Sequence, residues 1–577
     1  MNPSLRTVRV TFWTFALIAG ILQAWSYRFF IEPDGVNYLD IASAYLRHDW
    51  AAAINGYWSP LYSWLLAAIL GIVHPSAYWE STFLHLLNFI SYLVALRCFE
   101  FFFRRLLVLV ATRYPNTVDG QGLPEWAWWI IGYTSFLLAA LRLITLGMDT
   151  PDIVLAAFLF LSTGMVVDLA HRRGSVLSYT LLGVVLATAY FAKSVMFPMS
   201  FVFMFAAAFS GASGKRPEPR VLATLAAFAL VSCPFVGAIS RAKGHLTFGE
   251  TGKVAYLNEV KPSTIASPVV ASQNSEAPAG LSRQLFTEPA VYEYGSVPLS
   301  GTFPPWYDPS YWYTGTAVPF DPVQQVRAAI RGITNYLRIL SVEKEWIAGW
   351  LVLALFAGAW RETLKRWFEL WFLWFPAVVM LALYALVLVE PRYVGVAMAV
   401  TWIALFCALP WRQISATPRL GVAVVLAIAI TTGAALANEQ SANLAGCFHR
   451  TPHVQWLVAQ RLGQMNVQLG DHVAVLGHTT VADYWAHLAG LRIVADVPLE
   501  AVTSYWTAGP EKRVEISSRL GGLGIKVLVT DLRPVVMEGW DPLGNTGYYA
   551  QVLPTSNGRT HAQTETSPPD RNYKVPR

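Results

Sequence analysis

An acidic residue follows directly on the first apolar segment of the chain. Asp34 lies in the stretch Glu32-Pro-Asp-Gly-Val-Asn-Tyr-Leu-Asp-Ile-Ala42, just after an apolar run that ends near Tyr27. A carboxylate at this low-dielectric boundary can have its proton affinity tuned for general-base chemistry. The alternative is structural, because Asp is a favoured N-cap for a helix that begins near Val36. By helical periodicity, Asp40 does not lie on the same helix face as Asp34, and we expect its side chain to be solvated.

A second pair of carboxylates lies in Gly147-Met-Asp-Thr-Pro-Asp152. Asp and Thr before or beside Pro151 are typical of a helix N-terminus, which gives a structural reason for both acids. The functional alternative is that Asp149 or Asp152 reaches the site of Asp34 as a metal ligand or as an acceptor of substrate hydroxyls.

Basic residues stand near the ends of apolar segments. Lys193 needs a partner at that depth, and an anionic lipid headgroup would provide one; snorkelling to the interface is the alternative. Arg392 stands between Glu390 and Tyr393, and its planar fork suits a phosphate, although a local pair with Glu390 would also explain it. Arg142, near the end of its own segment, is a further candidate for the same anion site.

Aromatic residues cluster in two segments outside the apolar runs, where they could stack on sugar rings. Trp and Tyr also gather at membrane interfaces, so an interfacial belt is the competing explanation. The aromatic residues are Tyr38, Trp58, Tyr62, Trp306, Tyr307, Tyr311, Trp312 and Tyr313. As substrate-binding candidates we select Tyr38, Trp58 and Tyr62, together with Glu390 and Tyr393.

The composition identifies a membrane protein. Of 577 residues, 55% are hydrophobic and only 14% are charged, and the mean hydropathy is +0.41; these values are too apolar for a soluble chain of this length. The net charge of +6 comes from short basic clusters between apolar runs, as in cytoplasmic loops, so we predict no nucleic-acid partner. Cys98, Cys233, Cys407 and Cys447 lack the spacing of metal ligands.

The apolar runs predict a mainly α polytopic protein. A spanning helix needs about 20 apolar residues, and about eleven segments qualify. With the N-terminus in the cytoplasm, every strong basic cluster falls on the cytoplasmic side, and the three acidic regions above fall together on the outer face. The segments are 10–28, 79–103, 126–146, 151–170, 175–192, 195–211, 220–240, 346–360, 367–389, 391–411 and 418–437, with 61–73 expected as a surface helix.

Beyond the apolar runs, three parts of the chain are distinct. The outer loops 28–78 and 241–345 belong to a transmembrane domain of residues 1–437, with juxtamembrane helices outside the cytoplasm. Residues 438–554 form an extracytoplasmic α/β module, in which 472–477, 491–495 and 525–530 are predicted strands of a parallel sheet, separated by helices near 479–490 and 510–521. The Ser/Thr/Pro-rich residues 555–577 are predicted to be disordered.

These features together resemble the C-type superfamily of integral-membrane glycosyltransferases, which includes protein O-mannosyltransferases and lipid A aminoarabinose transferases. The resemblance covers most of residues 1–410 and depends on the order and side of its motifs. The motifs are Asp34–Ala42 with Trp58–Tyr62 after the first span, Thr150–Asp152 before the fourth, Gly183–Lys193 at the end of the fifth, and Glu390–Tyr393 before the tenth.

The resemblance implies roles for individual residues. The acidic residue of the first outer loop is the catalytic carboxylate in that superfamily, which corresponds to Asp34, and the acidic residue of the second outer loop corresponds to Asp149 or Asp152. Basic residues at helix ends hold the lipid phosphate of the donor, which implicates Lys193 and Arg392. Many relatives carry a second acid where this chain has Gly35, so we favour a reaction without a metal, although a divalent ion is an open alternative.

We therefore predict a bacterial inner-membrane enzyme of the cell envelope. It would move a hexose or pentose from a polyprenyl-phosphate donor to a hydroxyl of a glycan, lipid or protein on the periplasmic side of the bilayer, with inversion and with Asp34 as general base. The alternatives are a flippase or transporter of lipid-linked saccharide, and a membrane-anchored glycan-binding protein. Transporters tend to show inverted repeats and ionisable residues at the midplane, and the candidate residues here gather at one face instead.

Overall fold

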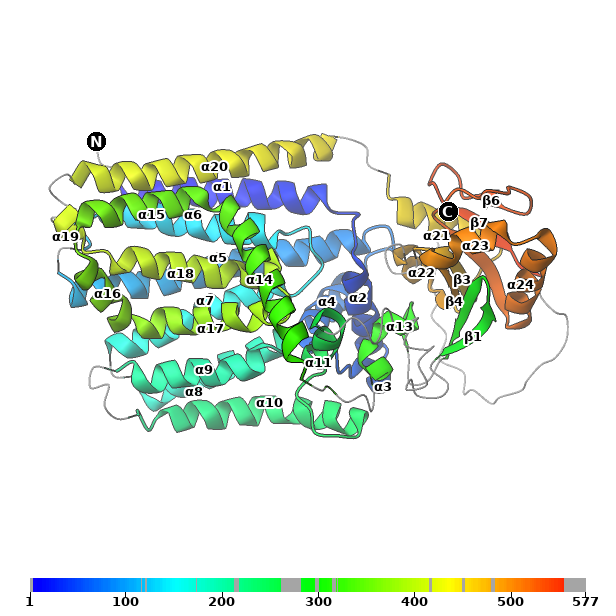
Figure 1. Ribbon diagram of the computed structural model, residues 1–577, viewed down its shortest axis with the longest axis horizontal. Helices are drawn as coiled ribbons and strands as arrows, with labels where there is room; N and C mark the ends of the chain where they lie inside the picture. Colours follow the sequence, from blue (N-terminus) through cyan, green and yellow to red (C-terminus); the bar gives the residue numbers. More distant parts are fainter. Residues whose placement is uncertain are drawn as a thin grey trace.

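In the computed structural model, a bundle of helices occupies one end of an elongated molecule and a module with a β-sheet occupies the other (Figure 1). The tail predicted to be disordered, 555–577, lies outside the described residues, as do parts of the loop 241–345. The structure describes residues 4–115, 117–119, 122–172, 174–211, 217–260, 282–295, 300–313, 318, 320–414, 418–448, 452–478 and 483–554.

Each predicted apolar segment forms a helix of the bundle, and the chain is a polytopic helical membrane protein. Among the described residues, 6 helices are individually long and apolar enough to cross a membrane, or up to 7 if a bent pair counts as one span. The predicted number of about eleven also includes the shorter helices α8, α9 and α17, and α5, which carries charges in its middle. The bounds are α1 Leu5–Ser26, α5 Glu80–Arg113, α6 Glu125–Leu137 with the π-helix η1 Leu138–Ile144, α7 Asp152–His171, α8 Val176–Ala192, α9 Met196–Phe209, α10 Val221–Lys243, α15 Lys344–Ala357 with α16 Trp360–Glu369, α17 Trp371–Ala385, α18 Pro391–Ala408, α19 Trp411–Ile414 and α20 Pro418–Phe448.

Helix α20 extends well beyond the predicted end of its apolar segment. It continues through the polar stretch 438–443 to Phe448, because helical hydrogen bonds persist where the hydropathy signal stops. The division that we predicted between residues 437 and 438 therefore falls inside a continuous helix.

Short helices lie between the bundle and the module (Figure 1). Helices α2 and α4 pack against each other, and α4 also packs against α5 and α8. Helix α14 crosses the bundle obliquely, with Val323, Val326, Ile330 and Ile333 exposed along one side, as in helices that lie in a membrane interface. The bounds are α2 Pro33–Leu46, α3 Trp50–Ala53, α4 Pro60–Val73, α11 Thr251–Ala255, η2 Tyr256–Val260, α13 Pro304–Tyr307, η3 Pro309–Tyr313 and α14 Pro322–Val342.

The module contains a 7-stranded sheet with the order β1-β2-β4-β3-β5-β7-β6. Strands β3, β4 and β5 are parallel, as predicted, and antiparallel strands extend the sheet on both sides. Strands β1 and β2 come from the loop 241–345, so the module is larger than residues 438–554. The bounds are β1 Ser282–Thr287, β2 Ala290–Tyr294, α21 Val454–Gln464, β3 His472–Gly477, α22 Tyr484–Ala489, β4 Arg492–Pro498, η4 Leu499–Ala501, α23 Val502–Thr507, α24 Pro510–Gly522, β5 Ile525–Thr530, β6 Asp541–Pro542 and β7 Tyr549–Val552.

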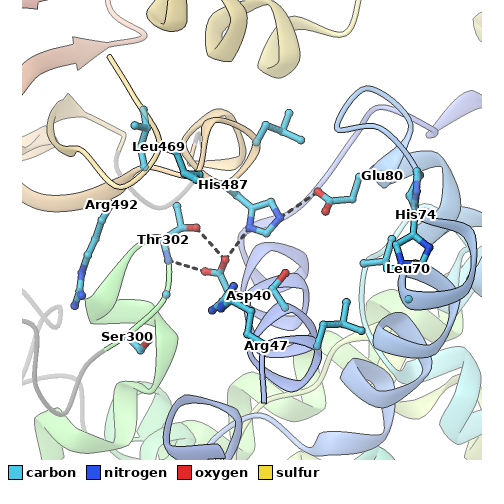
Figure 2. Close-up of a pocket in the computed structure, with 18 residues that line it drawn as sticks. Asp40, Arg47, Leu70, His74, Glu80, Ser300, Thr302, Leu469, His487 and Arg492 are labelled. Atoms are coloured by element: carbon cyan, nitrogen blue, oxygen red, sulfur yellow. Dashed lines mark hydrogen bonds and ion pairs between the residues drawn. The ribbon is translucent and has the colours of Figure 1, made fainter. Parts of the chain in front are cut away.

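Ionised groups join the module to the helices beneath it (Figure 2). His487 of α22 lies with Nδ1 2.7 Å from Asp40 Oδ1 and Nε2 3.1 Å from Glu80 Oε2. Burial lowers the pKa of His487, but the two carboxylates outweigh it and hold the pKa well above its usual value. The backbone N–H of Thr302 donates to Asp40 at 2.6 Å. The expectation that Asp40 is solvated is therefore wrong: its side chain is 10% exposed and joins the two parts of the molecule.

Candidate active site

Asp34, Asp152, Lys193 and Arg392 meet at the end of the bundle nearest the module. They come from the first turn of α2, the first residue of α7, the residue after α8 and the first turn of α18. Lys193 Nζ lies 2.6 Å from Asp152 Oδ1. Arg392 lies 3.8 Å from an oxygen of Asp34 and 3.9 Å from an oxygen of Asp152. Residues that are far apart in the sequence thus form one charged cluster.

Arg392 occupies the centre of this cluster. Its Nε donates to Glu390 at 2.8 Å and its Nη2 donates to the hydroxyl of Tyr393 at 3.2 Å. The ammonium of Lys193 lies 3.7 Å from the centre of the Tyr393 ring, a cation–π contact. The side chain of Asp152 is 2% exposed and that of Glu390 is 37% exposed. Asp152 is therefore a buried partner of both cations, and Glu390 is a more exposed carboxylate on Arg392.

Asp34 is accessible and has an environment suited to a base. Its side chain is 23% exposed, and the Nε1–H of Trp306 donates to it at 3.4 Å. Burial of the carboxyl raises the pKa of Asp34, and the charge of Arg392 opposes this only in part. Pro33 at the first position of α2 fixes the start of the helix. The result is a positioned carboxylate with a proton affinity above that of an ordinary aspartate.

Polar side chains hold the loop that leads into α7 and its first residue, Asp152. Gln23 accepts from the backbone N–H of Leu146 at 2.8 Å, and Asn88 donates to the carbonyl of Met148 at 3.0 Å. Tyr62 donates to Asn88 at 2.7 Å and is fully buried. Tyr62 was predicted to bind substrate, but burial against α5 makes it a support for this loop instead.

Asp149 faces away from the cations. It is fully buried, accepts from the backbone N–H of Glu32 at 2.9 Å and lies 3.5 Å from Nε2 of His85. Burial raises the pKa of Asp149 well above its usual value. Of the two acids that the sequence left open, Asp152 is the one that contacts Lys193 and Arg392.

The space around Gly35 is too small for a side chain, so a second acidic residue does not fit directly after Asp34. A Cβ atom at this position would lie 2.6 Å from the Cβ of Asp149, and neither atom can rotate away. We expect Gly35→Ala to destabilise the protein, because overpacking of about 1–3 kcal/mol outweighs the gain of up to about 1 kcal/mol for Gly→Ala in a helix. Thermal unfolding of the detergent-solubilised protein measures this.

Gly252 provides the matched control, since it is also helical and has no heavy atom within 4 Å of a Cβ built on it. Gly252→Ala should unfold at the wild-type temperature or slightly above it. Equal unfolding temperatures for the two variants would show that the contact between Gly35 and Asp149 is not tight.

The remaining candidates divide between support and other contacts. Tyr38 and Trp58 are buried, with ring centres 5.2 Å apart, and Nε1 of Trp58 donates to the carbonyl of Trp306 at 3.3 Å. They therefore pack beneath Trp306, the aromatic residue of the outer loop that reaches Asp34. Arg142 forms its ion pair with Glu439 of α20 at 2.8 Å and does not join Lys193 and Arg392.

Most aromatic side chains of the outer loop are buried within the protein. Tyr307, Trp312 and Tyr313 are buried among other side chains, whereas Trp306 is half-buried beside the charged cluster. Trp306 was one of the aromatic residues predicted to lie outside the apolar runs, but it was not a predicted site residue. Its signal was the density of Pro and aromatic residues around it, which does not say which ring faces the site.

Within the described part of the chain, no group of three or more His, Cys, Asp or Glu side chains comes together in a way that could hold a metal ion. In the cluster itself, Asp34 and Asp152 face Arg392, and Asp152 also faces Lys193. Metal dependence stays a prediction to be measured.

No protein-family model and no curated protein matches the chain. Among solved structures, it is similar to ArnT from Cupriavidus metallidurans in the apo state, at 12% identity and a TM-score of 0.40, over 94% of this chain and 98% of that chain. ArnT bound to undecaprenyl phosphate gives 11% identity and a TM-score of 0.38 over the same shares. An oligosaccharyltransferase of Archaeoglobus fulgidus in complex with Zn and sulfate gives 13% identity and a TM-score of 0.47, over 89% of this chain and 68% of that chain.

Proposed function

We propose that this protein transfers a sugar from a polyprenyl-phosphate donor to an acceptor hydroxyl at the outer face of a bacterial inner membrane. The N-terminus would lie in the cytoplasm and the module in the periplasm. The observation that carries the proposal is the contact of one guanidinium, that of Arg392, with both Asp34 and Asp152. In this proposal Asp34 is the base and Arg392 is part of the anion site beside it, at the end of the membrane bundle.

The cations would receive the phosphate of the donor. Glu390 is the most exposed carboxylate in contact with Arg392, so a phosphate oxygen can take its place on Nε while Asp152 keeps Lys193 and the other side of Arg392 in position. Fixed positive charge next to the phosphate stabilises the negative charge that develops there as the sugar leaves. The lipid chain would lie between the helices and the surrounding bilayer.

Asp34 would act as general base in a single displacement. The acceptor oxygen attacks the anomeric carbon from the side opposite the phosphate, and its proton passes to the carboxylate of Asp34. The bond between the anomeric carbon and the phosphate oxygen breaks with its electron pair on the phosphate, so the configuration inverts. A raised pKa makes Asp34 a stronger base than an ordinary aspartate.

Turnover by the reconstituted protein tests this function. Proteoliposomes are supplied with undecaprenyl-phosphate hexose or pentose and with envelope glycans as acceptors, and release of undecaprenyl phosphate is followed with and without a chelator. We expect release that depends on the acceptor, and NMR of the product should show an inverted anomeric centre. Retained configuration, or release equal to that of empty liposomes with every donor, would contradict the proposal.

The place of the cluster also bears on the transporter alternative. Asp34, Lys193 and Arg392 lie at one end of the bundle, at helix termini, whereas substrate sites of transporters lie near the bilayer midplane. This position favours chemistry at the membrane surface.

A further inference from the structure

A polar cavity lies between the module and helices α2 and α4 (Figure 2). Its volume is about 890 Å³, and its walls include Asp40 of α2, Arg47 directly after α2, His74 after α4, the segment 300–302 and Arg492 at the start of β4. The charged cluster around Asp34 contributes no residue to this lining. The cavity is therefore separate from the proposed catalytic site.

The carboxylates of the cavity are already engaged. Asp40 accepts from the N–H and the hydroxyl of Thr302, at 2.6 and 3.0 Å, and contacts His487. Glu80 contacts the other ring nitrogen of His487. Both acids thus have cationic or polar partners within the protein, which fixes the walls and leaves little free negative charge for a ligand to meet.

The arginines give the cavity its chemical character. Arg47 and Arg492 come from opposite walls, one from the helices and one from the module, and in Figure 2 they lie on either side of Ser300. A guanidinium is always charged, and its fork matches a phosphate or a carboxylate. Among the described residues that line the cavity, none is Trp, Tyr or Phe, so these residues provide no aromatic ring to stack on the face of a neutral sugar.

The size of the cavity points to a ligand larger than a free ion. Pockets of about 300–1,000 Å³ hold small organic molecules, and 890 Å³ lies in this range. A short saccharide that carries a phosphate or a carboxylate matches both the volume and the charge. A polar lining with arginine forks fits such a ligand better than it fits an acyl chain.

The cavity and the catalytic cluster share structural elements. Helix α2 carries Asp34 and Asp40, which are six residues and therefore about 9 Å apart along the helix axis. The segment that forms the wall at Thr302 continues to Trp306, which contacts Asp34. The segment 302–306 thus links the wall of the cavity to the catalytic cluster.

We propose that this cavity binds the acceptor through a phosphate or carboxylate group held by Arg47 and Arg492. The identification as acceptor rests on the proposed transferase function. The anion site itself rests only on the cavity and its two arginines.

Binding to the purified full-length protein tests the anion site. Inorganic phosphate, glucose 6-phosphate and glucuronate are titrated by calorimetry, with glucose as the uncharged probe. Because hydrogen bonds to charged groups are strong, Arg47→Gln and Arg492→Gln should each weaken glucose 6-phosphate binding by about 10- to 100-fold. Arg533→Gln, at an exposed position of the module outside the cavity, is the control and should leave binding unchanged.

Two further measurements show where the anion binds and whether it belongs to a lipid headgroup. Arg392→Gln should leave this binding unchanged, whereas anion binding at the donor cluster would depend on Arg392. Nanodiscs with phosphatidylglycerol should compete with glucose 6-phosphate, relative to phosphatidylcholine nanodiscs, only if a lipid headgroup is the natural ligand. Arg47 is exposed, so its variant should fold even if that of Arg492 does not, and unfolding temperatures check both.

The inference is overturned if Arg47→Gln binds glucose 6-phosphate as tightly as the wild type, or if glucose binds equally well. Failure of the transferase proposal has a different signature, namely Arg47-dependent anion binding without any turnover of donor lipid. Conversely, suppose that turnover depends on Asp34 and is unchanged in Arg47→Gln and Arg492→Gln. That result would support the transferase function and show that the acceptor does not bind in this cavity.

Discussion

Asp34→Asn should reduce sugar transfer by about 10²–10⁴-fold, the usual contribution of a positioned general base. Asn has nearly the same shape and keeps an oxygen for the Nε1–H of Trp306, so the fold and the neighbouring contacts should survive. What is lost is the ability to accept the proton of the attacking hydroxyl. Initial rates of undecaprenyl-phosphate release from proteoliposomes measure this, together with binding of the donor lipid, which should change little.

Asp321→Asn is a matched control for this variant. Asp321 caps α14 by accepting from backbone N–H groups, and Asn is an equally good N-cap, so activity should stay near that of the wild type. If Asp34→Asn turned over donor at the wild-type rate, Asp34 could not be the base, and another group would have to take the proton.

Arg392→Gln should have the second-largest effect, a loss of about 10²–10³-fold in kcat, as for removal of a group that stabilises developing charge. It should also change the pH dependence. Asp34 must be deprotonated to act, so kcat/KM rises with pH through its pKa, which burial already raises and Arg392 lowers. Without Arg392 the pKa of Asp34 rises further, and the ascending limb of the profile should move to higher pH.

The pH profile separates this role from a structural one. A variant that is merely less stable loses activity without moving the ascending limb. Arg361→Gln, at an exposed position of α16, should leave both the rate and the profile unchanged. An unshifted limb in Arg392→Gln would show that the guanidinium does not act on the titration of Asp34.

The helical architecture could be predicted because apolar runs and basic clusters are local signals. The same signals predicted that Asp34, Lys193 and Arg392 lie on one side of the membrane. In the structure, Arg392 contacts both Asp34 and Asp152, and Asp152 pairs with Lys193. What the hydropathy pattern could not supply is the continuation of α20 through polar residues, since a helix outside the bilayer needs no apolar surface.

Local sequence patterns could not predict the contacts between segments that are distant in the chain. Asp40 looked solvated because its partner His487 lies 447 positions later, and Trp306 meets Asp34 across 272 positions. Asp149 and Asp152 were indistinguishable by sequence, and their orientation depends on the packing of Asp149 against Gly35. Tyr62 was predicted to bind substrate because the sequence around an aromatic residue beside a turn does not show whether its ring is exposed or buried.

The hairpin of β1 and β2 has a consequence for how this protein is made. It pairs with β4 through Tyr292 and Asp496 and through Glu293 and Ala495, so the sheet draws on two stretches of chain separated by the last membrane helices. The hairpin is synthesised before those helices, so it stays without its β4 partner until they have been inserted and β4 emerges. A fragment with only the C-terminal stretch would leave the edge of β4 open to pairing with other chains, so this part of the protein cannot be transplanted as a self-sufficient unit.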